Sequence, residues 1–394
     1  MTLRIGVDAS CWSNRRGYGR FARELMQAML EIAPEHEFVG FGDADALAAG
    51  PTGHANLRGI AVGQSVPATE AAAANGYRSP LDMLRLSRAV ARERPDVFFS
   101  PSVYSYFPLP PGQRAVVTIH DAIAERHPAL TLPTRRARLF WALKVRLALW
   151  QAGVVLTVSE YAADEIAEVH GIARERLRVA LEAPAAVYQP ATPAAVNSAR
   201  GRTGIPVSAP WFTYVGGFSP HKRLDLVLRA HAALVAEHDR ASAPRLVLAG
   251  RRTGDAFLSE GGTLEALAAT LGTTDLIHWT GYLSDEELCA LHSGATAALL
   301  PSESEGFGLP AVEAAACGTA VIATTHSPLP QLLAGGGIFV APGDLVGLTD
   351  AMRRLLADGA LRNRLGATAR QRAMALSWRD GARAAMAALT EAAA

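Results

Sequence analysis

The chain is poor in cysteine, and this scarcity limits its chemistry. Among its 394 residues the cysteines are Cys11, Cys289 and Cys317. An odd number, with no two spaced as CxxC, argues against a disulfide framework and a zinc site, and it is typical of a reducing compartment. No DxD-type pair ends an expected strand, and no histidines and cysteines have ligand spacing. We therefore expect no metal ion.

An excess of one charge and long apolar runs are lacking as well. Lysine plus arginine (38) nearly balance aspartate plus glutamate (37), so the net charge of +1 gives no electrostatic reason to expect nucleic acid as a partner. The first ten residues lack the basic and apolar regions of a secretory signal. The most apolar long window, residues 306–323, contains Pro310, Glu313 and Gly318, and it divides into a helix and a strand rather than a membrane span. We expect a cytoplasmic protein.

What the chain does have is enough length and apolar material for two globular domains. It is about two to three times the usual domain size, and 49% of its residues are hydrophobic while 19% are charged. Short apolar strands alternate with amphipathic helices in both halves, as in strand Leu3–Val7 before a helix over 20–32. This alternation predicts an α/β fold of two doubly wound Rossmann-like domains, residues 1–190 and 191–377, that face each other across a cleft.

Two segments interrupt the alternation. Residues 44–74 are rich in glycine, alanine and proline with little periodicity, and we interpret them as surface loops. Residues 184–209 are rich in proline and alanine and are the candidate interdomain linker. After strand Ala320–Ala323 we expect helices only.

The most informative loop follows the expected strand Ala297–Leu300. Gly306 and Gly308 allow close approach of the backbone to a ligand, and Pro310 suits the first turn of a helix, whose free amides can hold a diphosphate or a sugar hydroxyl. Glu305 lies in the loop and Glu313 lies eight residues later in the helix, so the two carboxylates can hold opposite ends of one elongated ligand. The alternative is that Glu303 and Glu305 are solvated acids at a helix start. This alternative explains Glu313 less well, because the neighbours of Glu313 are apolar and burying an unpaired carboxylate is costly.

This loop carries a resemblance to a known family. The segment that begins at Glu305 reads EGFGLP, and Glu313 follows it in the helix. The letters LLPS precede this segment, and AAACGTAVIAT follows Glu313. Together they resemble the family-4 retaining glycosyltransferases of the GT-B fold and group 1 type. The likeness runs over essentially the whole chain. It implies that Glu305 binds hydroxyls of the donor sugar, that Glu313 holds the ribose, and that amides around Phe307, Gly308 and Leu309 meet sugar and phosphates. It also implies that the helix at 378–394 returns to the N-terminal domain.

A basic loop, Gly216 to Arg223, follows the strand Trp211–Val215. A departing diphosphate gains negative charge in the transition state, so it needs a cation such as Lys222, which Arg223 can assist. The alternative is a solvated basic helix start. The family often has a basic pair or an early arginine here, whereas this chain has His221 and Gly217, and the second phosphate-binding cation stays open.

In the N-terminal half His120 and Asp121 directly follow a strand. They resemble the family's contact to the donor sugar; the alternative for His120 is a buried, hydrogen-bonded side chain. The loop with Gly17 and Gly19 resembles the family's glycine-rich loop that reaches phosphates and acceptor, while Arg20 can equally be a surface residue. Together with residues 44–74, the Gly19–Arg20 loop is expected to select the acceptor.

Two weaker features remain. The backbone near Tyr282 matches the family's contact to the nucleobase, although an aromatic residue at a strand end is often only part of the core. A helix over 135–151 alternates arginines with large apolar residues and lacks acids, so it either packs on the sheet or rests on an anionic membrane.

Together with the family resemblance, these features predict an enzyme that moves a hexose, mannose or glucose above all, from a GDP- or UDP-sugar. The expected acceptor is a hydroxyl of a glycan, a lipid-linked molecule or a small molecule. The configuration of the sugar is expected to be retained, and no other cofactor is expected. Catalysis is assigned to His120, Lys222 and Glu305, and bacterial polysaccharide or glycolipid synthesis is the context that the family implies. Alternatives kept open are a phosphorylase or epimerase on a similar fold and a non-catalytic nucleotide-sugar-binding scaffold. Peripheral membrane contact at the inner face and a homo-oligomer are compatible with the sequence.

Overall fold

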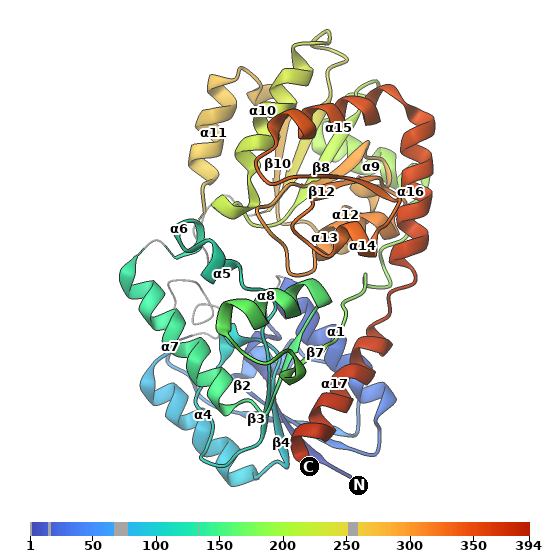
Figure 1. Ribbon diagram of the computed structural model, residues 1–394. Helices are drawn as coiled ribbons and strands as arrows, with labels where there is room; N and C mark the ends of the chain where they lie inside the picture. The colour runs from blue at the N-terminus through green and yellow to red at the C-terminus, as the bar shows by residue number, and fades with distance from the viewer. Residues whose placement is uncertain (1, 15–16, 67–77, 133, 251–258) are drawn as a thin grey trace. The chain divides into compact units, whose positions relative to one another are not determined.

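The structure, a computed structural model, describes residues 2–14, 17–66, 78–132, 134–250 and 259–394. The chain divides into two compact units (Figure 1). Unit 1 comprises Met1–Glu182 and Ser377–Ala394, and unit 2 comprises Ala183–Leu376. Each unit is a parallel sheet with helices on both faces, which confirms the α/β prediction of two Rossmann-like domains.

Unit 1 contains, within its described residues, a seven-stranded parallel sheet of order β3-β2-β1-β4-β5-β6-β7. Its strands are β1 (Arg4–Asp8), β2 (Glu37–Gly42), β3 (Leu57–Ala61), β4 (Val97–Ser100), β5 (Ala115–Thr118), β6 (Val154–Thr157) and β7 (Leu177–Val179). Its helices are α1 (Gly17–Ile32), α2 (Ala44–Ala48), α4 (Pro80–Glu93), α5 (Ile123–Arg126), α6 (Pro128–Thr131), α7 (Arg135–Gln151), α8 (Glu160–His170) and α17 (Trp378–Ala393).

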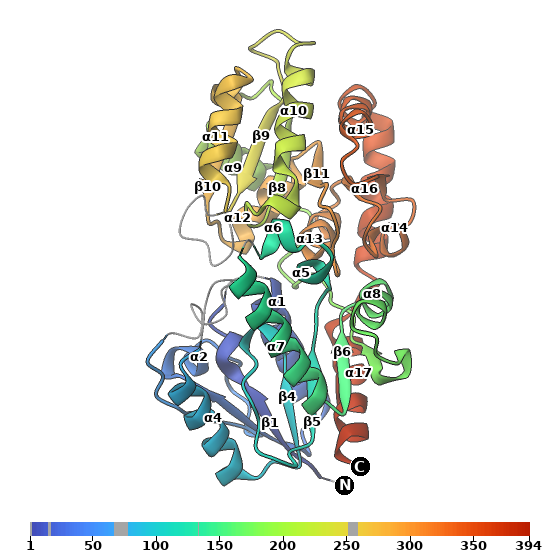
Figure 2. The same ribbon diagram turned by 60° about the vertical axis from the view of Figure 1, so that its left-hand side comes forward.

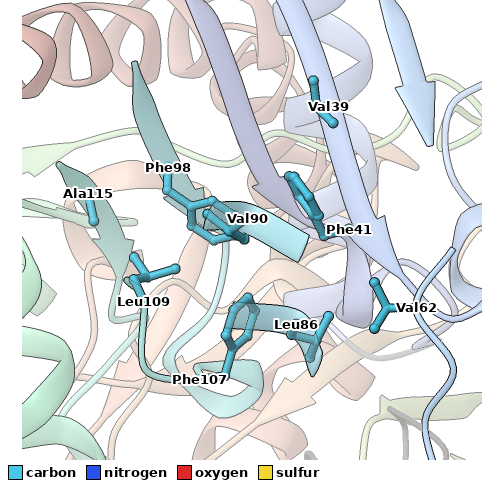
Figure 3. Close-up of a cluster of buried hydrophobic side chains, with 9 residues drawn as sticks. All are labelled: Val39, Phe41, Val62, Leu86, Val90, Phe98, Phe107, Leu109 and Ala115. Carbon is cyan, nitrogen blue, oxygen red and sulfur yellow. The ribbon is translucent and has the colours of Figure 1, made fainter. Parts of the chain in front are cut away.

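A buried apolar cluster joins α4 to the sheet of unit 1 (Figure 3). Val39 and Phe41 point to the same face because side chains two apart on a strand share a face. Leu86 and Val90 come from α4 four residues apart, which places them on one side of the helix. Phe98 stacks edge-to-face on Phe107 with ring centroids 5.7 Å apart. This packing fixes α4 against the first strands of the sheet.

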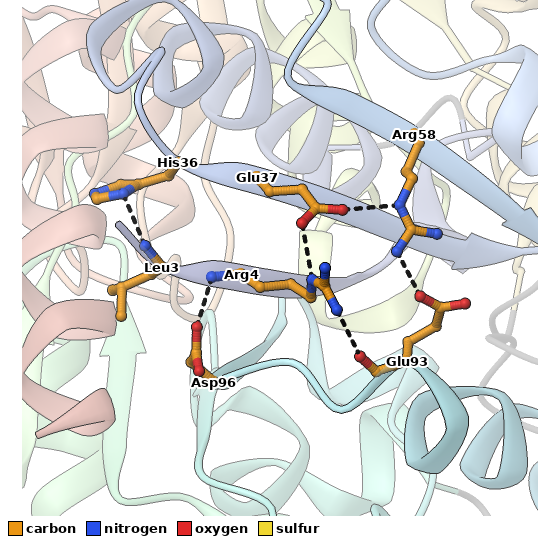
Figure 4. Close-up of polar contacts among 7 residues, drawn as sticks. All are labelled: Leu3, Arg4, His36, Glu37, Arg58, Glu93 and Asp96. Atoms are coloured by element: carbon orange, nitrogen blue, oxygen red, sulfur yellow. Dashed lines mark hydrogen bonds and ion pairs between the residues drawn. The ribbon is translucent and has the colours of Figure 1, made fainter. Parts of the chain in front are cut away.

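Charged residues at the start of β1 and β2 hold the opposite end of the same strands (Figure 4). Glu37 accepts hydrogen bonds from Arg4 Nε at 2.8 Å and from Arg58 Nε at 2.9 Å. Arg58 also pairs with Glu93 at the end of α4. Hydrogen bonds from the two arginines, of which the one from Arg58 has the larger effect, lower the pKa of the Glu37 carboxyl. These pairs are partly exposed, so each contributes little stability but fixes which strands lie side by side.

The last helix of the chain, α17, packs on unit 1. It contacts α1 and strands β4 to β7. Ala382, Ala385 and Leu389 are fully buried, and Arg178 of β7 pairs with Glu391 at 2.7 Å. The most distant part of the sequence therefore covers the sheet that the first residues begin.

Unit 2 contains, within its described residues, a six-stranded parallel sheet of order β10-β9-β8-β11-β12-β13. The first four of these strands are labelled in Figure 2. Its strands are β8 (Trp211–Val215), β9 (Arg245–Ala249), β10 (Ile277–Gly281), β11 (Ala297–Leu300), β12 (Val321–Thr324) and β13 (Gly337–Val340). Its helices are α9 (Pro193–Thr203), α10 (Leu224–Val235), α11 (Gly261–Thr270), α12 (Asp285–Ser293), α13 (Leu309–Ala316), α14 (Leu329–Leu332), α15 (Leu345–Ala357) and α16 (Gly359–Ala373).

The structure corrects three expectations. Residues 184–209 are not a linker, because they contain α9 and pack on unit 2: the Tyr188 hydroxyl donates to Asp285 Oδ1 at 2.9 Å. The first boundary therefore follows Glu182 rather than residue 190. Residues 44–74, expected as loops, contain α2 and the edge strand β3, and the region after residue 323 contains β13 as well as helices.

Three buried histidines make the stability of the fold sensitive to acid. Burial lowers the pKa of His120, His231 and His292 from 6.5 to about 4. Between these values the unfolded chain binds more protons than the folded chain, so the free energy of unfolding is largest above pH 6.5 and falls as the pH drops towards 4. At pH 5 each histidine lowers it by about 2 kcal/mol relative to neutral pH.

We expect His231→Gln to flatten this dependence. The amide nitrogen of glutamine can replace the Nε2 atom that contacts the Pro244 carbonyl at 2.9 Å, but glutamine does not titrate. The difference in melting temperature between pH 7.5 and pH 5 should be smaller in the variant than in the parent, measured by scanning calorimetry in matched ionic strength. The partly exposed His54→Gln serves as a control, and an unchanged difference in His231→Gln would contradict the assignment.

Candidate functional site

The candidate site of unit 2 lies where the order of its strands reverses. β8 and β11 are neighbours in the sheet, but the chain leaves β8 towards β9 and leaves β11 towards β12 on the other side. The loops after two such strands diverge and leave a crevice at the carboxyl edge of the sheet, where ligands bind in open α/β sheets. Lys222 belongs to the loop after β8 and Glu305 to the loop after β11, so two residues predicted as catalytic meet here.

Lys222 and Glu305 form an ion pair. Lys222 Nζ donates to Glu305 Oε1 at 2.7 Å, and the Ser302 hydroxyl donates to the same oxygen at 2.5 Å. The Glu305 side chain is 9% exposed and that of Lys222 is 21% exposed. In the described part of the chain Oε2 of Glu305 accepts no hydrogen bond, which leaves it available to a ligand hydroxyl. The pair is thus mostly withdrawn from water and has one free acceptor.

Backbone bonds hold the Glu305 loop on both sides. The Glu303 amide donates to the His221 carbonyl at 2.8 Å, which connects this loop to the one after β8. The Glu305 amide donates to the His326 carbonyl, after β12, at 3.0 Å. The carboxylate is therefore held in place before any ligand arrives.

The loop Gly216–Phe218 is fixed from below by β8 and β9. The Tyr214 hydroxyl donates to the Gly217 carbonyl at 2.7 Å, and the Gly216 amide donates to the Ala249 carbonyl at 3.0 Å. A Cβ atom at Gly250 would lie 2.1 Å from the Gly216 carbonyl oxygen, so only glycine fits there. Burial and, secondarily, the nearby Glu305 raise the pKa of the Tyr214 hydroxyl far above its usual range.

Arg223 and Glu303 have a different environment from the one expected. Arg223 adopts a left-handed conformation (φ 54°) at the start of α10 and pairs with Glu303 and with Asp225, the latter at 3.1 Å. Glu303 is therefore not a solvated acid. Arg223 connects the two loops, and its contact to a phosphate stays a prediction.

The helix α13 begins at the end of the same loop. Gly308 has φ 87° and its Cβ position would lie 2.7 Å from Leu329, so glycine is required by conformation and by space. The amides of Phe307, Gly308 and Leu309 stand at or just before the first turn of this helix. Glu313 lies on the next turn and is buried. Its predicted contact to the ribose is untested, as is that of Gly306 to the sugar.

Tyr282 lies apart from this group in the sheet. It follows β10, two strands away from β8, and it is 54% exposed. The side chain is thus not part of the core, and the predicted backbone contact to a nucleobase stays a prediction. Within the described residues no group of three or more histidine, cysteine, aspartate or glutamate side chains is arranged to hold a metal ion.

Unit 1 places His120 after β5 in a buried position. Its Nε2 donates to the Pro101 carbonyl at 3.0 Å, and its ring packs edge-to-face on Phe21 at 4.8 Å. The lowered pKa of His120 keeps the imidazole neutral at pH 7, so the proton lies on Nε2 and Nδ1 is the acceptor. Nδ1 lies 3.9 Å from Glu182 Oε1. Glu182 is a buried acid that sequence analysis missed, since nothing in its local sequence marks it.

Asp121, Gly17 and Gly19 have local structural roles. Asp121 Oδ1 accepts from the Ile123 amide at 3.0 Å and so shapes the turn into α5. Gly17 and Gly19 lie in the first turn of α1, so the helix begins three residues before the expected Arg20. A Cβ at Gly19 would lie 2.1 Å from the Asn14 carbonyl oxygen, whereas Gly17 faces open space. Gly19 is thus required for packing, and Gly17 leaves backbone accessible at a helix N-terminus.

The helix α7 turns a basic, apolar face outward. Its inner face is Val145, Ala148 and Leu149, which are buried. Trp150 is 80% exposed and Leu139 is 69% exposed, although both are large apolar residues. The remaining exposed residues of the helix are Arg135, Arg136, Arg138, Phe140, Ala142, Leu143, Arg146 and Leu147. Among the described residues no helix has the length and apolar character needed to cross a membrane.

Comparison with known proteins gives matches to both halves. Residues 196–372 match the family described as "Glycosyl transferases group 1", and residues 15–180 match "Glycosyltransferase Family 4". A D-inositol 3-phosphate glycosyltransferase of Frankia alni is 36% identical over 210 residues, 52% of this chain and 51% of that protein. The chain thus spans about half the length of this curated relative.

Solved structures share the fold over nearly the whole chain. Sucrose-phosphate synthase from Thermosynechococcus elongatus has a TM-score of 0.76 at 19% identity, covering 99% of this chain and 98% of that one. HepE of Anabaena, in complex with UDP and glucose, has a TM-score of 0.71 at 16% identity, covering 99% and 100%. At these identities the likeness concerns the fold alone.

Proposed function

We propose, since the chain belongs to the group 1, family 4 glycosyltransferases of the GT-B fold, that it transfers a hexose from a nucleoside diphosphate sugar to an acceptor hydroxyl with retention of configuration. The observation that carries the proposal is the Lys222–Glu305 ion pair at the reversal of strand order in unit 2. A diphosphate needs a cation, and a sugar hydroxyl needs an acceptor such as a free carboxylate oxygen. This ion pair offers both side by side.

The residues of unit 2 divide the work along the donor. Lys222 neutralises the charge that develops on the departing diphosphate, and the amides at the start of α13 add the positive end of a helix. Glu305 accepts hydroxyl hydrogen bonds from the hexose, and Glu313 those of the ribose. Because Glu305 is hydrogen-bonded to Lys222 and Ser302, it positions the sugar and is not cast as a nucleophile. The acceptor then attacks from the face that the diphosphate leaves.

The donor is proposed to be a GDP- or UDP-sugar. HepE, which shares the fold, is described in complex with UDP and glucose, and an MMP alpha-(1->4)-mannosyltransferase of Mycolicibacterium hassiacum is 42% identical over 127 residues. Mannose and glucose are therefore the first sugars to test. The Frankia alni relative is named for inositol 3-phosphate, so we include small phosphorylated molecules among the acceptors to test, beside glycans and lipid-linked acceptors.

The test is a release assay with a panel of donors. The purified chain is incubated with UDP-glucose, GDP-glucose, GDP-mannose or UDP-galactose and a panel of acceptors, and nucleoside diphosphate release is measured. Proton NMR of the new anomeric signal decides the stereochemistry, and an α-linked product from an α-linked donor is expected. A β-linked product would refute retention. Nucleotide binding without release with any donor would favour the scaffold.

We further propose that the outer face of α7 rests on an anionic membrane. Five large apolar side chains among arginines, without an acid in the helix, match a surface of apolar chains and negative head groups. We expect co-sedimentation with vesicles of phosphatidylglycerol and phosphatidylcholine (1:1), weaker binding to pure phosphatidylcholine, and at least a 10-fold loss in Leu139→Ser/Trp150→Ser. Val207→Ser, equally exposed in unit 2, is the control. No binding to the anionic vesicles at millimolar lipid would contradict this proposal.

A further inference from the structure

Two cationic side chains, Arg78 and Lys144, lie close enough in unit 1 to interact electrostatically. Arg78 precedes α4, and its Cζ lies 5.7 Å from the centre of the Phe107 ring. Lys144 belongs to α7, where Nζ donates to the Tyr104 carbonyl at 3.2 Å and lies 5.8 Å from the centre of the Trp141 ring. Neither residue has a role in the sequence-based site.

Both cations are withdrawn from water without a counter-charge. The Nη1 and Nη2 atoms of Arg78 are buried and donate no hydrogen bond to the described residues. In that part of the chain no carboxylate lies within ion-pair distance of Arg78 or Lys144. Burial and the nearby Arg78 lower the pKa of Lys144 to about 8. Two like charges buried together destabilise a fold unless an anion joins them.

An aromatic wall runs from these cations to the first turn of α1. Tyr104 packs against Trp141 in a tilted arrangement with ring centroids 5.0 Å apart, and Tyr18 stacks on Tyr104 at 5.3 Å. Tyr18 lies between Gly17 and Gly19, and Tyr104 follows β4, the neighbour of β1 where the strand order of this sheet reverses. The wall therefore lies at the crevice position of unit 1, and aromatic faces beside polar groups are typical of small-molecule sites.

We propose that Arg78 and Lys144 bind the phosphate group of a phosphorylated acceptor, whose polyol or sugar part lies against Tyr18, Tyr104 and Trp141. The proposal rests on the proposed glycosyl transfer and names the acceptor class. An arginine and a lysine without acids fit a phosphate, because the guanidinium donates in a fork and the ammonium adds a point charge. The phosphate can belong to a free phosphorylated polyol or to a phospholipid head group; the chemistry that is recognised is the same.

The test compares Lys144→Met with Arg88→Met in the full chain. Arg88 lies on α4 of the same unit and is exposed, so both variants lose one charge and only one loses the buried cation. Melting temperature is measured with inorganic phosphate against chloride at equal ionic strength, with UDP or GDP saturating the donor site. We expect phosphate to stabilise the parent and Arg88→Met, and its apparent affinity to fall at least about 10-fold in Lys144→Met.

A second readout excludes a purely structural role. Without phosphate, Lys144→Met should melt at or above the parent, because it removes an uncompensated buried charge. A lower melting temperature together with an unchanged phosphate response would overturn the proposal, as would the absence of any phosphate response in the parent. The nucleotide response should survive in Lys144→Met; its absence in the parent would instead contradict the proposed function.

Two further ligands identify the source of the phosphate. Glycerol 3-phosphate represents a free phosphorylated polyol, and dihexanoylphosphatidylglycerol below its micelle concentration represents a lipid head group. The stronger response names the source, and it must weaken in Lys144→Met but not in Arg88→Met. A response of equal size in both variants overturns the assignment for either source.

Discussion

Replacing Lys222 by methionine is expected to lower kcat by about two to three orders of magnitude, the usual cost of removing one group that stabilises developing negative charge. The ammonium is held 2.7 Å from Glu305, in a loop fixed by Tyr214 and Gly216, so no neighbouring cation can move into its place without breaking these bonds. Arg223 is already paired with Glu303 and Asp225. Steady-state release of nucleoside diphosphate measures the effect.

Two controls separate catalysis from folding. Arg229→Met removes an exposed cation from α10 of the same unit and should leave kcat unchanged. Because Lys222→Met leaves Glu305 buried without its cation, its melting temperature is measured as well, and kcat is compared at a temperature at which parent and variant both stay folded. A kcat within about threefold of the parent in Lys222→Met would refute the role, since that is far below the expected loss.

The second large effect concerns binding rather than turnover. Glu313→Gln should weaken the nucleoside diphosphate by about 10- to 150-fold, because hydrogen bonds to a charged acceptor contribute about 1.5–3 kcal/mol. The carboxylate is buried in α13 among Ala314, Ala315 and Val312, and glutamine keeps its size. Isothermal titration with UDP and GDP measures the affinity.

A modified ligand tests the atoms involved. If Glu313 accepts from the ribose hydroxyls, the parent should discriminate against the 2′-deoxy nucleotide, and Glu313→Gln should bind the two forms with similar affinity. Equal discrimination in parent and variant would mean that Glu313 does not contact this hydroxyl.

Sequence reasoning was most accurate where one segment carries all the information. Helix Arg135–Gln151 and strands Trp211–Val215 and Ala297–Leu300 have the predicted bounds, because each is a regular apolar pattern with a clear start and end. The β3 strand was missed because its residues are only partly buried, which removes the alternation on which a strand prediction depends. The β13 strand is partly exposed as well.

The candidate site shows the same limit. Lys222 and Glu305 were each selected from their own loops, but their ion pair depends on β8 and β11 being neighbours, and no local pattern states this. Glu303 was interpreted as a solvated acid because its partner, Arg223, lies 80 positions away in the sequence. Arg78 and Lys144 were not selected as a site for the same reason. The residues of one loop indicate which chemistry that loop can support. Which loops meet is decided by the order of the strands in the sheet.

The position of α17 has a consequence for how the chain is made. The last strand of the unit 1 sheet ends at Val179, yet the helix that covers the sheet begins at Trp378. At a translation rate of about 5–20 residues per second, roughly 10–40 seconds separate the two on the ribosome. During that time the apolar face that α17 will cover is exposed on the nascent chain, while all of unit 2 is synthesised. We therefore expect a chaperone to bind ribosome-bound chains that end before residue 377. The chaperone should no longer bind the full-length chain, in which α17 covers this face.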